Sequence, residues 1–460
     1  MQNLKPAAKK LLNLSEFLGI TISLVLLPID RFPYLHYVPL HLGFVSLILL
    51  IMAALGRLYS VWRSNRHRDF KRYILIGAAL ALPVVAYGQS IFYAIDHPYA
   101  LGATKLLAAV ALRAFCFFVL VSETPQLWRL IKKTIYITTA VVVAFAFFQF
   151  FFDVFGASPK ITDLRPCCTS NHSTYVFPRV HSTSIEPLYF ANYLLIPIWL
   201  LSLDFLRSER LRRSRLHLLL FGASATIVFL TLSRGAILAF LISGLVFALG
   251  LPKPKRQARP FWRKKIKLWV LSLAASLALI LMASIASQFI HKQAINGSHS
   301  GAGNVQIFSS HAVNVVDDSA KTRYTLWPKA LTYIKEKPIQ GVGAYNSRIR
   351  LNIDQYKQGV NPKALQPFNN DLIGLLVDLG LIGIIAFAPL IYGVFAAILR
   401  LFRSSWEGEA AAMAMIMIGM LVQSNFFHSI LLSRLWIVAG LLLTVLSPKR
   451  TTNQQAKKAT

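Results

Sequence analysis

Residues 218–251 read LLLFGASATIVFLTLSRGAILAFLISGLVFALGL, two apolar runs separated only by Ser233, Arg234 and Gly235. Neither run alternates between apolar and polar residues, as each strand of an outer-membrane barrel would. In a hydrocarbon core an α-helix satisfies its own backbone hydrogen bonds, so an uninterrupted apolar run favours a helix. The stretch therefore predicts two membrane-spanning helices joined by a very tight turn.

Apolar runs of this kind recur along the chain. Of its 460 residues, 55% are hydrophobic and only 15% are charged, and the mean hydropathy is +0.53. A helix of about 20 apolar residues crosses a hydrocarbon core of about 30 Å. We therefore predict an all-α polytopic membrane protein with about 12 transmembrane helices. The expected spans are 12–29, 36–56, 73–94, 102–121, 134–153, 188–206, 218–232, 235–251, 268–288, 370–399, 410–427 and 430–447.

These spans divide the chain into transmembrane groups and two long outer loops. The span 370–399 is long and contains several glycines, so we expect a short helix, a break and then a full span. In the second outer loop, apolar residues at spacings of three and four predict a membrane-surface helix over Arg323–Glu336. The parts are the N-terminal transmembrane helices 1–153, the outer loop 154–187, the central helices 188–288, the large outer loop 289–369, the C-terminal helices 370–447 and the tail 448–460.

The net charge of +31 would suggest nucleic-acid binding in a soluble protein. In this chain most basic residues instead lie in the segments predicted on the inner side of the membrane. With the N-terminus inside, 31 of the 49 Lys and Arg residues fall in inner segments, and ten of the others lie in the long loop 289–369. Long loops translocate largely regardless of charge. We therefore expect a multi-pass protein of the bacterial inner (cytoplasmic) membrane with both termini cytoplasmic, and no nucleic-acid partner.

The three cysteines do not indicate a metal site. Cys116 lies within an apolar run, and Cys167 and Cys168 are adjacent in the first outer loop, where neighbouring cysteines rarely bridge to each other. No CxxC or HExxH spacing occurs. We expect neither a metal nor another cofactor.

Three arginines on the predicted outer side are the best candidates for chemistry. Arg234 lies between two spans, where a guanidinium is costly unless it faces a polar cavity, an anion or a partner. Arg179 precedes the span at 188, and Arg323 opens the expected surface helix. Arginine suits bidentate phosphate binding, so the three predict an anion clamp for a lipid-linked phosphate or diphosphate. The alternatives are an Arg234 that snorkels to the interface, an Arg179–Glu186 surface pair and a solvated Arg323.

A second candidate region lies where the last long loop enters the membrane. Asn369 and Asn370 stand at the mouth of a span and could form a site wall, or cap the following helix, or both. Gly341 and Gly343 lack the context of a nucleotide-binding loop and favour a tight turn. Other groups on the outer side could titrate or bind. They are His181, His311, His428, Glu186, Asp317, Asp318 and Asp371.

Four of these pieces, in order, resemble the O-antigen ligase and polymerase family of bacterial membrane proteins. The resemblance covers about residues 170 to 385. The pieces are Arg179 with Glu186-Pro187, Ser233-Arg234-Gly235, Arg323 with Trp327 and Lys337-Pro338-Ile339-Gln340-Gly341-Val342-Gly343, and Asn369-Asn370 followed after nine residues by Gly380-Leu381-Ile382-Gly383.

The resemblance implies a membrane glycosyltransferase that takes a glycan from undecaprenyl diphosphate on the periplasmic face and passes it to lipid A-core, a growing glycan or a protein. It implies no nucleotide sugar and no metal. The partners would be the lipid-linked glycan, the acceptor and membrane lipids. The implied catalytic residues are Arg179, Arg234, Arg323, Asn369 and Asn370, and the implied substrate-binding residues are His181, Glu186, Ser233, Trp327, Gly341 and Gly343.

One position departs from the family pattern. Family ligases commonly have His-Asn where this chain has Asn369-Asn370. Because an amide cannot accept a proton at physiological pH, Asn369 positions the acceptor, or His181, His311 or Glu186 acts as the base, or ligase chemistry has been lost. A polymerase on the same scaffold, a transporter and a non-catalytic polysaccharide assembly protein remain alternatives. The absence of a recognisable internal repeat weighs against the transporter.

Overall fold

The computed structural model describes residues 6–29, 38–154, 179–184, 186–208, 211–250, 259–295, 318–362, 365, 367–403 and 409–446. Every regular element in these ranges is a helix, which confirms the predicted all-α polytopic membrane protein. The N-terminal helices are α1 (Pro6–Val25), α2 (Val38–Arg63), α3 (His67–Ser90), α4 (His97–Glu123) and α5 (Leu127–Val154). The central helices are α7 (Pro187–Arg207), α8 (Leu211–Leu230), α9 (Arg234–Gly250) and α10 (Arg259–Ile295). The C-terminal part contains α12 (Asp318–Glu336), α13 (Ser347–Leu351), α14 (Ile353–Lys357), α15 (Asp371–Arg403), α16 (Glu409–Gln423) and α17 (Ser433–Leu443), and the short turns η1 (Ile91–Tyr93) and η6 (Thr444–Leu446) complete the description.

Each predicted span overlaps one helix, although the number of membrane crossings itself stays a prediction. Among the described residues seven helices are long and apolar enough to cross a membrane, and they are α2, α3 with η1, α4, α5, α7, part of α10 and α15. Helices α8, α9, α16 and α17 contain shorter apolar stretches. Helix α10 continues to Ile295, beyond the predicted end at 288.

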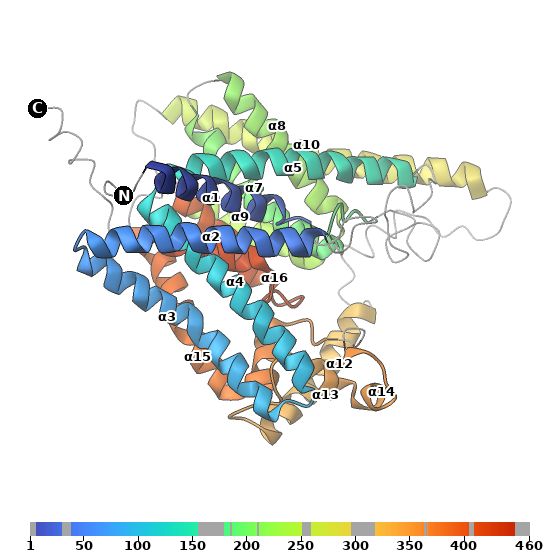
Figure 1. The fold of residues 1–460 in the computed structure, drawn as a ribbon. Helices are drawn as coiled ribbons and strands as arrows, with labels where there is room; N and C mark the ends of the chain where they lie inside the picture. Colours follow the sequence, from blue (N-terminus) through green and yellow to red (C-terminus); the bar gives the residue numbers. More distant parts are fainter. Residues whose placement is uncertain are drawn as a thin grey trace, which may run out of the picture.

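The helices form one bundle with a small assembly at one end. Figure 1 shows α12, α13 and α14 together at the end of the bundle away from the N-terminus. The centre is formed by α7, α16 and α17. In the most apolar stretch of α7, 83% of the residues are buried within the protein. Helix α7 packs against α8 on one side and α16 on the other, and α17 packs against α4.

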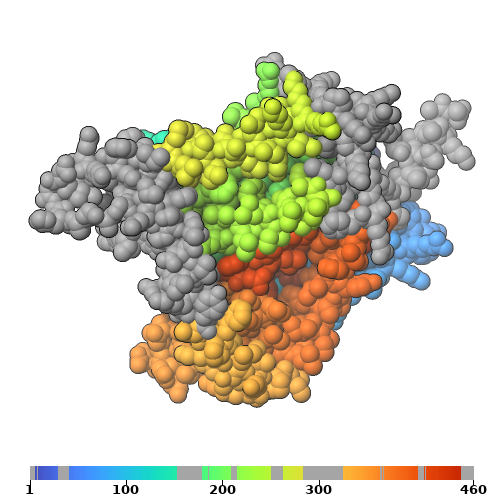
Figure 2. All heavy atoms as spheres, turned by 180° about the vertical axis from the view of Figure 1, so that it is seen from behind, coloured from blue at the N-terminus to red at the C-terminus, as the bar shows by residue number. Residues whose placement is uncertain are grey.

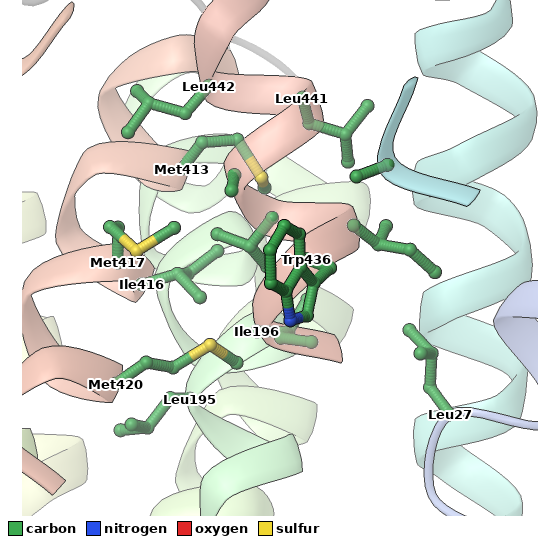
Figure 3. Close-up of a cluster of buried hydrophobic side chains, with 14 of the residues drawn as sticks. Leu27, Leu195, Ile196, Met413, Ile416, Met417, Met420, Trp436, Leu441 and Leu442 are labelled. Atoms are coloured by element: carbon green, nitrogen blue, oxygen red, sulfur yellow. The ribbon is translucent and has the colours of Figure 1, made fainter. Parts of the chain in front are cut away.

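Close packing rather than a hydrophobic driving force holds such helices together, because lipid tails are as apolar as leucine. In Figure 3, Met413, Met417 and Met420 of α16 lie on one side of Trp436 of α17, and Leu195 and Ile196 of α7 belong to the same buried cluster. Methionine is flexible and fills irregular gaps, which suits a junction of three crossing helices.

The predicted break in the long span is confirmed. Helix α15 departs from helical geometry at Gly380, whose φ is 58° and ψ is −145°. A Cβ at this position would lie 2.6 Å from the Ile339 carbonyl oxygen. The loop from Pro338 docks onto the break, with Leu381 N donating to Pro338 O at 2.9 Å and Ile382 N donating to Ile339 O at 3.1 Å. The break therefore anchors the segment after α12 to the start of α15.

The predicted surface helix is present but begins earlier, at Asp318, and ends at Glu336 as expected. A second apolar cluster attaches it to the bundle. Leu326 and Ala330 are buried there with Val342, Phe368 and Val377. Trp327 and Leu331, on the predicted apolar face, are instead 50% and 59% exposed. This exposed face is what a helix on a membrane surface would present.

Candidate functional site

The turn between α8 and α9 is as tight as the sequence predicts. Leu232 takes a positive φ of 49°, and the Ser233 carbonyl accepts the first bond of α9 from Ile237 N at 2.9 Å. Ser233 is buried and Arg234, the first residue of α9, is partly exposed. A Cβ at Gly235 would lie 2.6 Å from the ring of Phe426, so glycine allows that ring to pack directly against the turn.

Arg179 lies at the same turn. Its Nε donates to the Thr231 carbonyl at 3.3 Å, and Val180 N donates to Leu230 O at 3.3 Å. The tertiary structure thus brings together Arg179 and Arg234, two of the three arginines that the sequence selects. The alternative surface pair is absent from the described part of the chain, where Glu186 forms no ion pair and is exposed ahead of α7.

His181 belongs to a buried turn beside these arginines. Its Nδ1 lies 2.8 Å from the Ser184 carbonyl oxygen, and its side chain is only 2% exposed. Next to it, Ser182 N donates to Gln149 Oε1 at 2.7 Å, and Gln149 Nε2 donates to Ser182 O at 3.1 Å. These contacts fasten the segment that carries Arg179 to α5.

Asn369 and Asn370 differ in their surroundings. Asn370 Oδ1 accepts from Ile373 N at 2.9 Å, so the expected N-cap of α15 is confirmed. Its Nδ2 donates to Asn425 Oδ1 at 3.3 Å. Asn369 takes a positive φ of 54° and its side chain makes no hydrogen bond to the described residues. Asn370 therefore holds the helix, and Asn369 is the one available to a ligand.

The connection between α16 and α17, residues 424–432, joins these motifs. Asn425 contacts Asn370, Phe426 packs on Gly235, and the ring of Phe427 lies 5.0 Å from that of Tyr189. We call residues 424–432 the α16–α17 connection. Figure 2 shows this face hollowed between α9 and the segment from α12 to α15, with the deep red of the C-terminal helices at the floor.

The same connection places a histidine beside a carboxylate. His428 Nδ1 lies 3.3 Å from Asp371 Oδ1, and both side chains are buried. Asp371 also accepts from Ser429 N at 2.9 Å and from the Ser429 hydroxyl. The imidazole stands over Gly374, where a Cβ would lie 2.5 Å from its Cε1. Within the described residues His428 Nε2 has no hydrogen-bond partner, so one ring nitrogen is oriented and the other is available.

From the sequence, His428 is only one of several polar groups predicted on the outer side, and nothing there places it in the site. The available signal was the polar run Ser424-Asn425 and His428-Ser429 between two apolar spans, but no spacing in the sequence relates it to Asp371. Tyr345 was also missed. Its ring lies 5.3 Å from that of His428, and Arg348 stacks over it at 4.7 Å. Burial raises the pKa of the Tyr345 hydroxyl, which therefore stays protonated and can donate a hydrogen bond.

Gly341 and Gly343 act through the backbone, as the tight-turn interpretation predicts. Their φ angles are 68° and 103°, and Gly343 N donates to Asp378 O at 2.8 Å. A Cβ at Gly341 would lie 2.4 Å from the backbone of Asp378. Both glycines hold the loop close to α15, and their predicted contact with substrate stays a prediction.

For Arg323, the third arginine, the structure gives the position of its helix but not of its side chain. Arg323 lies in α12, and its side chain is outside the described part of the structure. Helix α12 packs against α15, whose first residues belong to the site. Trp327 lies one turn further along α12 and is half exposed.

An apolar groove of about 230 Å³ starts at this site and runs between α15, α16 and α17. Its polar end is formed by Asp371, Ser424 and Ser429. Further along, exposed side chains such as Ile391 and Phe395 flank it. Such a groove can take a hydrocarbon chain whose polar end meets the α16–α17 connection.

Comparison with known proteins matches the part of the chain that contains several of the residues described above. Residues 219–388 match the family model described as O-antigen ligase, a segment that runs from α8 to the middle of α15 and contains Arg234, Arg323, Asn369 and Asn370. No curated protein matches the chain. Over residues 219–388 the chain is therefore similar to the O-antigen ligase family.

Proposed function

We propose that this protein transfers a glycan from undecaprenyl diphosphate to an acceptor hydroxyl on the periplasmic face of the inner membrane, as an O-antigen ligase-like glycosyltransferase. The observation that carries the proposal is the meeting of Arg179 and Arg234 at one turn, which the α16–α17 connection links to Asn370 and to the His428–Asp371 pair. A cationic turn suits the diphosphate of a lipid-linked donor, and the adjoining apolar groove suits its lipid chain. A positioned base suits the acceptor hydroxyl.

In the proposed reaction the bond between the sugar C1 and the diphosphate oxygen breaks as the acceptor oxygen bonds to C1. The diphosphate leaves with one more negative charge, and the acceptor hydroxyl loses its proton. Arg179, Arg234 and Arg323 would hold the diphosphate, since guanidinium groups placed where charge develops stabilise the transition state. The lipid chain would follow the groove between α15 and α17.

The acceptor proton needs a base that Asn369 cannot supply. We assign this role to His428, because Asp371 orients its Nδ1 and leaves Nε2 available. Asn369, with its amide unengaged by the described residues, would hold the acceptor hydroxyl. His181, Glu186, Ser233, Trp327, Gly341 and Gly343 would shape the binding site around the donor.

The test is transfer by the purified protein in detergent, with an undecaprenyl-diphosphate glycan as donor and lipid A-core as acceptor. We expect transfer by the wild type and a loss of about 10²- to 10³-fold in kcat for Arg234→Ala, the usual effect of removing one group that stabilises developing charge. Arg263→Ala, which removes an exposed arginine of α10 outside the site, is the control. Longer glycans without transfer to core would identify a polymerase, and no glycan chemistry at all would refute the proposal.

The proposed topology has its own test. Lys357 in α14 and Arg68 at the start of α3 are both exposed. Figure 1 shows α14 and the start of α3 at opposite ends of the bundle. In a background with Cys167 and Cys168 changed to serine, we expect an impermeant maleimide to label Lys357→Cys in intact spheroplasts. Arg68→Cys should react only after the membrane is broken. The reverse pattern would place the site in the cytoplasm.

A further inference from the structure

A second pocket lies away from the α8–α9 turn, among α1, α2, α4 and the start of α17. It encloses about 310 Å³, and most of its wall is apolar. Two guanidinium groups, those of Arg113 and Arg434, line it, and no carboxylate does so among the described residues. The described lining residues therefore bring positive charge to this pocket and no negative charge.

Arg113 is held by neutral groups. Its Nη1 donates to Ser433 Oγ at 2.7 Å and its Nη2 donates to the Gly43 carbonyl at 2.9 Å. Its Nε is buried without a partner among the described residues. These bonds fix the orientation of the guanidinium but leave its charge uncompensated, which is costly within a membrane-spanning segment.

Arg434 is next to Ser433 and is only 1% exposed. Its Nη1 donates to the Tyr189 carbonyl at 2.8 Å, and its guanidinium lies over the Tyr189 ring at 5.7 Å. Both arginines are therefore tied to the first residues of α17 and reach the same pocket from two helices. Burial of two like charges is stabilised when an anion joins them.

The surroundings of the pocket identify the kind of anion. Phe44 and Leu106 line it and are 65% and 47% exposed, on helices long and apolar enough to cross a membrane. Lys105, next to Leu106, lies about two turns from Arg113 on the same side of α4 and is exposed. An opening flanked by exposed apolar side chains faces lipid rather than water, so the ligand would carry a hydrocarbon chain.

We propose that this pocket binds an anionic membrane phospholipid, with its phosphate on Arg113 and Arg434 and an acyl chain along the apolar wall. The site is independent of the proposed transfer reaction and extends the partners of the protein to a bound lipid of the surrounding membrane. Two guanidinium groups can give charge-assisted hydrogen bonds to one phosphate, and a zwitterionic lipid would add an unfavourable ammonium group nearby.

The experiment is native mass spectrometry of the full-length protein in detergent, with added phosphatidylglycerol or phosphatidylcholine of the same acyl chains. We expect phosphatidylglycerol to be retained about tenfold more tightly, the difference that one charge-assisted bond makes. Arg113→Gln and Arg434→Gln should remove this preference. Arg129→Gln, which changes an exposed arginine at the start of α5 outside the pocket, should not.

If the loss of an arginine prevents folding, a variant that keeps both arginines can still test the site. Ala109 lines the pocket and is partly exposed, so Ala109→Trp should fill it while both arginines remain. Loss of phosphatidylglycerol in this variant supports the site. Equal retention of the two lipids, retention unchanged by Ala109→Trp, or a preference for undecaprenyl phosphate over phosphatidylglycerol would overturn the proposal. None of these readouts depends on glycan transfer, so a failure here is distinct from a failure of the proposed enzyme.

Discussion

His428 Nδ1 lies 3.3 Å from Asp371 Oδ1, although His428 belongs to the α16–α17 connection and Asp371 is the first residue of α15. Asp371 is also held by Ser429 of the same connection, so the carboxylate and the imidazole are fixed relative to each other. A histidine oriented by a carboxylate through one nitrogen, with the other nitrogen available, is the arrangement of a general base.

We predict that His428→Gln lowers kcat for glycan transfer by about 10²- to 10⁴-fold, the usual contribution of general acid–base catalysis. Donor binding should change little, because the arginines remain. His97→Gln, at an exposed position at the start of α4, is the control. An unchanged kcat would remove His428 from the mechanism.

Asn369→His should restore the family residue at the mouth of α15. Asn369 has a positive φ of 54°, a conformation that histidine tolerates better than most residues. We expect this change to recover at least part of the transfer activity that His428→Gln removes, because a second imidazole is then available to the acceptor. Steady-state kinetics of the double variant measures the recovery. A double variant no more active than His428→Gln alone would show that the two positions do not serve the same acceptor.

Gly235→Ala should move the turn between α8 and α9 away from the α16–α17 connection. A Cβ there would lie 2.6 Å from the Phe426 ring, and overpacking of this kind costs about 1–3 kcal/mol. We predict a lower Tm in detergent and reduced transfer. Phe426→Ala should recover stability in the double variant, since it removes the two ring atoms that lie nearest to the new Cβ. Strictly additive effects of the two changes would mean that the contact does not couple the turn to the connection.

Gly380→Ala should be more damaging than an ordinary glycine substitution in a helix. Gly380 combines φ 58° with ψ −145°, which only glycine adopts readily, and the Ile339 carbonyl lies 2.6 Å from the position of a Cβ. Gly102→Ala in α4 is the matched control, because nothing lies within 4 Å of its Cβ. Replacing that glycine should stabilise the helix by up to about 1 kcal/mol. Thermal melts of both variants make the comparison, and equal Tm values would contradict the role of the break.

The helices and the tight turn at Arg234 follow from local sequence. An apolar run of membrane length has few alternatives to a helix, because every backbone polar group must find a partner within it. The N-cap by Asn370 and the break at Gly380 were predictable for the same reason, since each depends on the conformational preference of one residue and its near neighbours.

What only the tertiary structure decided is which of these segments meet. Nothing in the sequence relates Arg179 to Thr231, Gly235 to Phe426 or Asp371 to His428, because each contact depends on how the helices pack across the bundle. The exposed side of α12 and the pocket at Arg113 likewise depend on how the helices pack against one another. Local preferences therefore determined the elements and their ends, and the packing of those elements against one another determined the site.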